Sequence, residues 1–108
     1  MEETKFSEKV YTIDELKSLL SPIFASYPVR KATLFGSYAR GEADSGSDLD
    51  IVVDCDYKTM GFGYYGMWEK IRMSVGKLVD LIHVIELKID TPIYNNVQNE
   101  GVSIYEQT

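Results

Sequence analysis

Two aspartates, Asp48 and Asp50, stand one residue apart, and a Gly36-Ser37 pair lies about a dozen positions before them. Carboxylate oxygens are ligands that Mg²⁺ accepts, and a glycine at a tight turn lets an anion approach main-chain N–H groups. Two carboxylates held side by side repel each other unless a cation, a proton or water relieves the repulsion. The two pairs together predict a phosphate-binding turn beside a site for a divalent cation.

A strand is needed to hold the two aspartates together. Residues 49–54, with the sequence LDIVVD, are mostly apolar and β-branched, which predicts a largely buried strand. Side chains at positions i and i+2 of a strand point to the same face. We therefore expect Asp48 and Asp50 to point together at the solvent-facing end of this strand.

A second strand and a short helix are expected before the aspartates. The run KATLF has β-type residues and stops at Gly36, and the residues from Ser37 to Arg40 are compatible with a helix. Ser37 adds a hydroxyl donor next to the glycine. Arg40, one turn later, adds a guanidinium group that either steadies phosphates or pairs with Glu42 or Asp44.

The stretch GSYARGEADSGSDLDIVV resembles the signature of the DNA polymerase β-like nucleotidyltransferases, in which a Gly-Ser pair precedes Asp-x-Asp in a strand. The short chain, the GSxARG form and the closing segment QNEGVSIYEQ are more similar to one branch, the minimal nucleotidyltransferases. These are small prokaryotic proteins often encoded beside a HEPN-domain partner. The family has a third carboxylate on a later strand, and Asp80 in KLVDLIHVI corresponds to it.

The resemblance implies a role for each of these residues. Gly36 and Ser37 would hold the β- and γ-phosphates of a nucleoside triphosphate, with Arg40 as a further phosphate ligand. Three carboxylates would be catalytic and would bind Mg²⁺ or Mn²⁺: Asp48, Asp50 and Asp80. The third of these would also lie near the acceptor hydroxyl, where it helps to bind a second metal or takes up the proton.

The expected reaction transfers a nucleotidyl group, AMP from ATP by preference, to a hydroxyl of a partner protein. By resemblance the partner is a HEPN toxin and this chain is its antitoxin. Larger relatives carry extra domains that hold the acceptor, so we expect a second chain to present it here. Two alternatives stay open: a catalytically silent module that neutralises its partner by binding, and a transferase for aminoglycoside-like small molecules.

The composition limits the class of partner and the location. The 108 residues are expected to form one nucleotidyltransferase domain over residues 1–108. A net charge of −6 without a Lys/Arg cluster disfavours long nucleic acids and favours a protein with a basic surface. No apolar run approaches membrane-spanning length and the N-terminus has no signal-peptide core, so we expect a cytoplasmic protein. The oligomeric state stays open.

The remaining sequence predicts helices that alternate with strands. A capping box of Thr12 and Glu15 starts a helix that ends near residue 26, and a second helix covers residues 63–75. A third strand spans residues 78–85, and a last helix from Pro92 leads into a C-terminal tail. The fold class is therefore α/β, and the resemblance implies a small mixed β-sheet flanked by helices, the nucleotidyltransferase fold.

Two further residues have reactive side chains but are expected to have packing or surface roles. Cys55 is the only cysteine and lies at the end of the second strand, where a small packed residue is the better interpretation. His83 stands three residues after Asp80, so it should face the opposite side of its strand, in a packing or a surface role.

Overall fold

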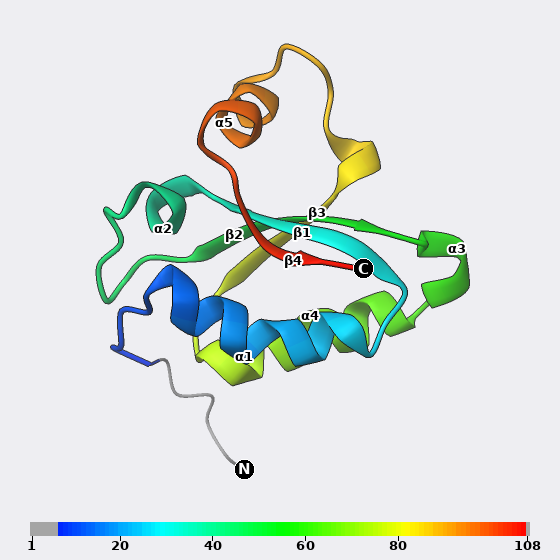
Figure 1. Ribbon diagram of the computed structural model, residues 1–108, viewed down its shortest axis with the longest axis horizontal. Coiled ribbons are helices and arrows are strands. Elements are labelled where there is room, and N and C mark those ends of the chain that lie inside the picture. Colours follow the sequence, from blue (N-terminus) through cyan, green and yellow to red (C-terminus); the bar gives the residue numbers. More distant parts are fainter. Residues whose placement is uncertain (1–6, 108) are drawn as a thin grey trace.

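The computed structural model describes residues 7–107 and contains a four-stranded sheet with helices on both sides (Figure 1). The strands are β1 (Val29–Phe35), β2 (Leu49–Cys55), β3 (Val79–His83) and β4 (Val102–Glu106), in the spatial order β3-β2-β1-β4. β1 is antiparallel to β2 and to β4, whereas β2 and β3 are parallel. The prediction of a small mixed sheet flanked by helices is confirmed.

The parallel pair joins two predicted site residues that are distant in the chain. Parallel neighbours need a long crossover connection, and here α3 (Tyr57–Met60) and α4 (Gly63–Val75) provide it. The resulting register pairs Asp50 of β2 with Asp80 of β3. The crossover thus sets the position of the third carboxylate.

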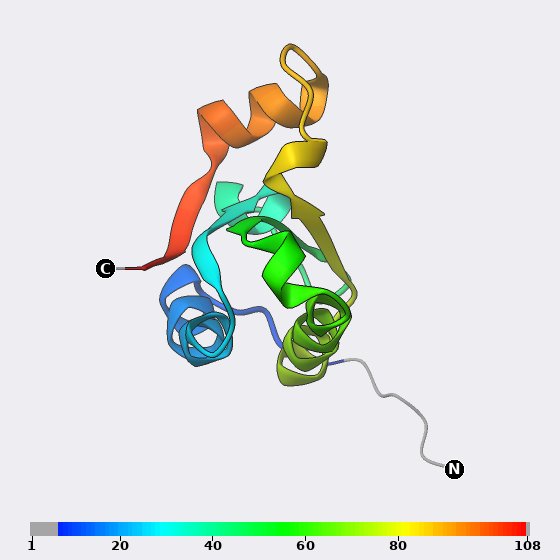
Figure 2. The ribbon, with the colours of Figure 1, turned by 90° about the vertical axis from the view of Figure 1, so that its right-hand side faces the viewer.

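Two helices, α1 (Ile13–Ala25) and α4, cover one face of the sheet side by side, as Figures 1 and 2 show. The predicted capping box is present: the Thr12 hydroxyl accepts from the Glu15 amide at 3.0 Å, and the Glu15 carboxylate accepts from the Thr12 amide at 2.9 Å. Leu16, Leu20 and Phe24 follow one turn apart and are fully buried. The start of α1 and its buried face are therefore both set by local sequence.

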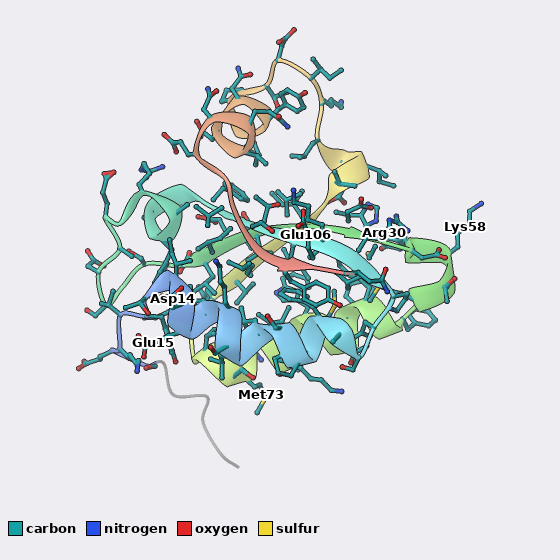
Figure 3. All side chains as sticks on the ribbon, in the orientation of Figure 1. Asp14, Glu15, Arg30, Lys58, Met73 and Glu106 are labelled. Atoms are coloured by element: carbon teal, nitrogen blue, oxygen red, sulfur yellow. The ribbon has the colours of Figure 1, made fainter. Side chains whose placement is uncertain are left out.

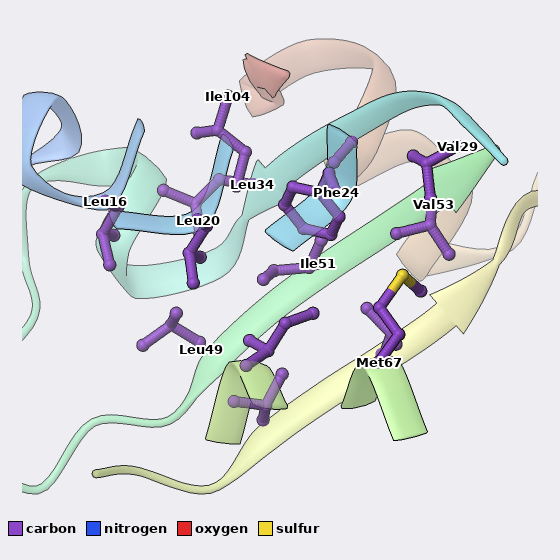
Figure 4. Close-up of a cluster of buried hydrophobic side chains, with 14 of the residues drawn as sticks. Leu16, Leu20, Phe24, Val29, Leu34, Leu49, Ile51, Val53, Met67 and Ile104 are labelled. Atoms are coloured by element: carbon purple, nitrogen blue, oxygen red, sulfur yellow. The ribbon is translucent and has the colours of Figure 1, made fainter. Parts of the chain in front are cut away.

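The hydrophobic core lies between these helices and the sheet (Figure 4). Leu49, Ile51 and Val53 alternate along β2 and point into it, where they meet Met67 of α4 and the buried side chains of α1. Each fully buried aliphatic side chain stabilises the fold by roughly 1.5–3 kcal/mol. Because strand side chains alternate, the intervening residues of β2, which include Asp50, face the other side of the sheet.

That other side carries η1 (Val84–Glu86) and α5 (Pro92–Glu100), which Figure 2 shows across the sheet from α1 and α4. The predicted helix start is confirmed, since Pro92 is the first residue of α5 and the Thr91 hydroxyl accepts from the Tyr94 amide at 3.2 Å. α5 contacts β1 and so stands next to the strand that leads into the predicted phosphate turn.

Three parts of the predicted element order were wrong. The expected C-terminal tail is strand β4, whose Ile104 is buried against the core. The predicted strand over residues 78–85 ends at His83, because the next residues turn into the 3₁₀ helix η1. The short helix α3 was not predicted at all.

All of the helices are short. α1 and α4 have 13 residues each, and α5 has 9. Within residues 7–107, no helix combines the length and the apolar character that crossing a membrane requires.

Candidate active site

The candidate site begins where β1 ends and α2 (Gly36–Arg40) starts. Gly36 has a φ of 75°, in the left-handed region, and its neighbour Phe35 is paired with Asp50 across the sheet. A Cβ atom added to Gly36 would collide with Oδ2 of Asp50. Only glycine therefore combines this backbone conformation with so close an approach to the carboxylate.

Ser37 follows in the first turn of α2, where its side chain is half-buried. The first N–H groups of a helix have no acceptor within that helix. The predicted phosphate ligands Gly36 and Ser37 thus lie at the start of α2, with Gly36 next to the Asp50 carboxylate. Their role as ligands stays a prediction.

The three predicted carboxylates gather at one end of the sheet. Asp50 and Asp80 are direct partners on β2 and β3, and Asp48 lies just before the first residue of β2. Asp48 and Asp80 are exposed, whereas Asp50 is half-buried. The structure therefore brings together the residues that the sequence singled out, and their roles as catalytic residues and metal ligands stay predictions.

The charge of this cluster is unfavourable without a cation. Burial raises the pKa of the Asp50 carboxyl, and the negative charges of Asp80 and then Asp48 raise it further, while the positive charge of Arg40 acts in the opposite direction. Three carboxylates around a half-buried position are the arrangement that a divalent cation relieves.

The donor set fits a hard divalent cation. Carboxylate oxygens are preferred by Mg²⁺, which is usually bound by one or two protein carboxylates together with substrate phosphates and water. Within the part of the chain from residue 7 to residue 107, no three His, Cys, Asp or Glu side chains are arranged so that they could hold a metal ion by themselves. A cation bound at Asp48, Asp50 and Asp80 would therefore need further ligands from outside the chain, such as nucleotide phosphates, and metal binding at these residues stays a prediction.

Arg40 makes two ion pairs. Its Nε donates to Glu42 Oε1 at 2.9 Å, which is one of the pairings that the sequence predicted. Its Nη1 donates to Glu100 Oε2 at 3.1 Å. Asp44, the other predicted partner, instead accepts from the Gly46 amide at 2.8 Å within its own loop. Arg40 thereby ties α2 to the last residue of α5.

The structure confirms that Cys55 is a packed residue, and of the two roles expected for His83, packing or surface, it shows packing. Cys55 is buried, and its pKa is raised by that burial. His83 is buried as well: its Nδ1 accepts from the Ile85 amide at 3.2 Å, which leaves Nε2 as the donor to the Cys55 carbonyl at 3.0 Å. Both residues lie toward the far end of β2 and β3 from the aspartates.

Sequence reasoning overlooked Lys77, a charged residue that is only 3% exposed beside the loop of Asp48. The alternation of the third strand could have indicated this burial, because Val79, Leu81 and His83 are the positions of β3 that face the protein interior. Counting back by two from Val79 places Lys77 on the same buried side.

Solved structures share this fold. A chain of a toxin-antitoxin crystal structure with AMP-PNP superposes with a TM-score of 0.67 at 19% identity, over 85% of this chain and 74% of that chain. A structure of a tri-AMPylated HEPN toxin from Shewanella oneidensis in complex with an MNT antitoxin gives a TM-score of 0.62 at 17% identity, over 89% of this chain and 74% of that chain.

Sequence relatives are closer. A Methanocaldococcus jannaschii protein is 31% identical over 85 residues, which are 79% of this chain and 81% of the relative. The protein adenylyltransferase MntA of Thermococcus cleftensis is 33% identical over 81 residues, which are 71% of this chain and 82% of the relative. The family model for the polymerase beta nucleotidyltransferases matches residues 18–108. The chain thus belongs to the polymerase beta nucleotidyltransferase family.

Proposed function

We propose that this chain is an adenylyltransferase that transfers AMP from ATP to a hydroxyl of a partner protein, a HEPN toxin that it neutralises. The observation that carries the proposal is the register of β2 and β3, which sets Asp50 beside Asp80 at the turn of Gly36. The Thermococcus cleftensis relative is a protein adenylyltransferase, and the Shewanella oneidensis structure holds an AMPylated HEPN toxin with its antitoxin.

Each site residue has a task in this reaction. Gly36 and Ser37 hold the β- and γ-phosphates through main-chain N–H groups and the serine hydroxyl. Asp48, Asp50 and Asp80 hold Mg²⁺ or Mn²⁺, which neutralises charge on the phosphates when it is bound. Since phosphoryl-type transfer depends mainly on positioning and charge stabilisation, the chain needs no covalent intermediate.

The transfer exchanges one bond at the α-phosphorus. The acceptor oxygen forms a bond to this phosphorus, and the bond from the phosphorus to the bridging oxygen of the β-phosphate breaks. Pyrophosphate leaves with that electron pair. Asp80 is the exposed member of the β2–β3 pair, so an acceptor hydroxyl can reach it from solvent. There Asp80 either helps to bind a second metal or takes up the hydroxyl proton, directly or through water.

The charge of the chain supports a protein acceptor. Phosphate contacts from Lys and Arg dominate the binding of long nucleic acids, and a net charge of −6 opposes it. The same charge attracts a partner with a basic surface. We place the reaction in the cytoplasm, where ATP is made and used.

The test is intact mass spectrometry of this chain and a co-expressed HEPN partner after incubation with ATP and Mg²⁺. The wild-type chain should add the mass of one or more AMP groups to the partner, and the Asp48→Asn/Asp50→Asn double variant should add none. Asp54→Asn is the matched control, because Asp54 lies on the same face of β2 at its other end and pairs with Arg30. This control should transfer AMP as the wild type does.

The same variants separate catalysis from neutralisation by binding. If the double variant still forms the complex but no longer neutralises the toxin, transfer is the mechanism. A partner that gains no mass with the wild-type chain, and that is neutralised equally by the double variant, would favour the silent binding module. Transfer to an added aminoglycoside with none to the partner would favour the small-molecule alternative.

A further inference from the structure

Among the lysines and arginines that the structure describes, Lys77 is the one whose side chain is buried, with 3% of the residue exposed. It lies between Gly76, which ends α4, and the first residue of β3. Its Nζ donates to the carbonyl oxygens of Ser7 and Ser45, at 3.1 Å each. A buried ammonium is costly unless it is hydrogen-bonded, so these two carbonyls account for its place in the interior.

The two acceptors belong to segments that are far apart in the chain. Ser7 is held against the turn after α4, where its amide donates to the Gly76 carbonyl at 2.7 Å. Ser45 belongs to the loop over residues 41–48, which runs from the end of α2 to Asp48. One ammonium group therefore links this loop to the helical layer.

The loop closes on itself and packs Ala43 against the core, and the Ser45 carbonyl is the acceptor through which Lys77 links it to the layer of α1 and α4. Asp44 organises a tight turn, in which its Oδ1 accepts from the Gly46 amide at 2.8 Å and its carbonyl accepts from the Ser47 amide at 3.1 Å. These contacts are local and exposed to solvent. They shape the turn, whereas Ala43 at its start and the bond from Lys77 to Ser45 attach it to the rest of the molecule.

Asp48 shares a small cavity with Lys77. The cavity measures about 140 Å³ and is bounded by Ser45, Gly46, Ser47, Asp48, Lys77 and Leu78. The next residue, Leu49, donates its amide to the Leu78 carbonyl at 3.0 Å. The position of Asp48 is thus determined from one side by the start of β2 and from the other by the loop that Lys77 holds.

We propose that Lys77 is a positioning residue of the nucleotidyl-transfer site: its buried ammonium fixes the loop so that Asp48 shares a divalent cation with Asp50. This inference rests on the proposed function. Lys77 touches neither nucleotide nor acceptor. Its removal should act through Asp48, as the loss of residues that orient metal ligands commonly lowers metal affinity by roughly 10- to 100-fold.

The variant Lys77→Met removes the ammonium and keeps most of the apolar stem. We expect the apparent KM for Mg²⁺ in AMP transfer to rise by about tenfold or more, with kcat at saturating Mg²⁺ within about threefold of the wild type. Lys77→Arg, which keeps charged donors, should recover part of the loss. Lys58→Met is the control, because Lys58 is exposed on α3 at the other end of β2 (Figure 3).

Hydrogen exchange tests the structural half of the inference without any reaction. In Lys77→Met, amides in residues 42–49 should exchange faster, while amides of the core strands keep their protection. Faster exchange spread over the whole sheet would show a general loss of stability and would overturn the positioning role, as would unchanged exchange in the loop. If Lys77→Met does not fold, Lys77→Gln, which keeps an amide donor, is measured in its place.

A binding measurement separates this inference from the proposed function. Mn²⁺ affinity is measured from the electron paramagnetic resonance signal of free Mn²⁺, with an α,β-methylene analogue of ATP present. A wild-type chain that binds Mn²⁺ but transfers no AMP would refute the proposed function, and Lys77 would still be judged by the Mn²⁺ affinity of its variant. Equal affinities in wild type and Lys77→Met, or a wild-type chain that binds no Mn²⁺, would overturn the positioning role.

Discussion

At Asp50, the predicted role in metal binding lowers the stability of the folded protein. The Asp50 carboxyl is half-buried, faces Asp80 and Asp48, and lies so close to Gly36 that no side chain fits there. The metal-free protein therefore gives up folding free energy at this position. Sites that bind metal and phosphate commonly keep such a cost, because the bound ligands offset it.

Asp50→Asn should stabilise the metal-free protein at neutral pH. The folded-state pKa of Asp50 is raised above the ordinary value of 3.8, so its contribution to stability is fully present below that value and is lost as the pH rises through the folded-state pKa. An amide stays neutral throughout. We expect a gain of roughly 1 kcal/mol near pH 7 and none near pH 3, measured by urea unfolding in EDTA. A loss of stability near pH 7 would contradict this account.

Gly36→Ala and Gly41→Ala form a matched pair at the two ends of α2. Both glycines have a φ of 75°, but only at position 36 does an added Cβ meet the Asp50 carboxylate, while at position 41 it meets nothing within 4 Å. Gly41→Ala should cost about 1 kcal/mol from backbone strain alone. Gly36→Ala should cost at least about 1 kcal/mol more and abolish AMP transfer. If thermal unfolding shows that the two variants lose the same amount of stability, the clash with Asp50 is relieved without an energetic cost.

At the scale of elements, the site depends on how α2, α5 and the strands are tied together. The Arg40–Glu100 pair joins α2 to the end of α5, and both side chains are more than a third exposed. An exposed ion pair of this kind adds little to stability. Its importance lies in where it holds Arg40, since the charge of Arg40 already acts on Asp50.

The two alternative roles of Arg40, phosphate ligand and structural tie, predict different effects on the KM for ATP. If Arg40 steadies phosphates, Glu100→Gln should free it and lower the KM for ATP by about threefold, while Arg40→Gln should raise this KM by about tenfold. Both variants should change the free energy of unfolding by less than about 1 kcal/mol. Steady-state kinetics with varied ATP decides the matter: an unchanged KM in both variants would leave Arg40 as a structural tie between α2 and α5.

At the scale of the whole molecule, charge and size argue together for a partner. The chain has 17 acidic and 11 basic residues, and three of the acids form the candidate site. Among the described residues, Asp80 of this site is exposed to solvent and is not covered by another helix or strand. The acceptor must therefore approach from outside, toward a negatively charged surface.

The association rate with the HEPN partner should fall as salt is added. Opposite charges on two proteins speed their encounter, and salt screens this attraction. Between about 20 and 300 mM NaCl we expect the association rate constant to drop roughly tenfold, with a smaller change in the dissociation rate. Stopped-flow or biosensor kinetics would measure both, and a salt-independent association rate would contradict electrostatic recognition.

The sequence by itself determined the residues of the site and the local elements. The motif of Gly36, Asp48 and Asp50, the capping box that starts α1 and the proline that starts α5 depend on neighbours within a few positions, so local rules recover them. Strand β4 was missed because its five residues gain their burial from distant elements, by pairing with β1 and by packing against α1.

Only the tertiary structure decided which distant residues meet. The family resemblance had already grouped Asp80 with Asp50, and the register of β2 and β3 shows how the two meet. The long-range partners of Arg40 and Lys77 were not predicted; they are Glu100 and the carbonyls of Ser7 and Ser45. Such contacts follow from strand register and from the crossover through α4, which no local periodicity contains. The sequence therefore identifies the residues of the candidate site, and the parallel pairing of β2 with β3 sets Asp50 beside Asp80, because alternation along the strands puts the core residues on one face of the sheet and these carboxylates on the other.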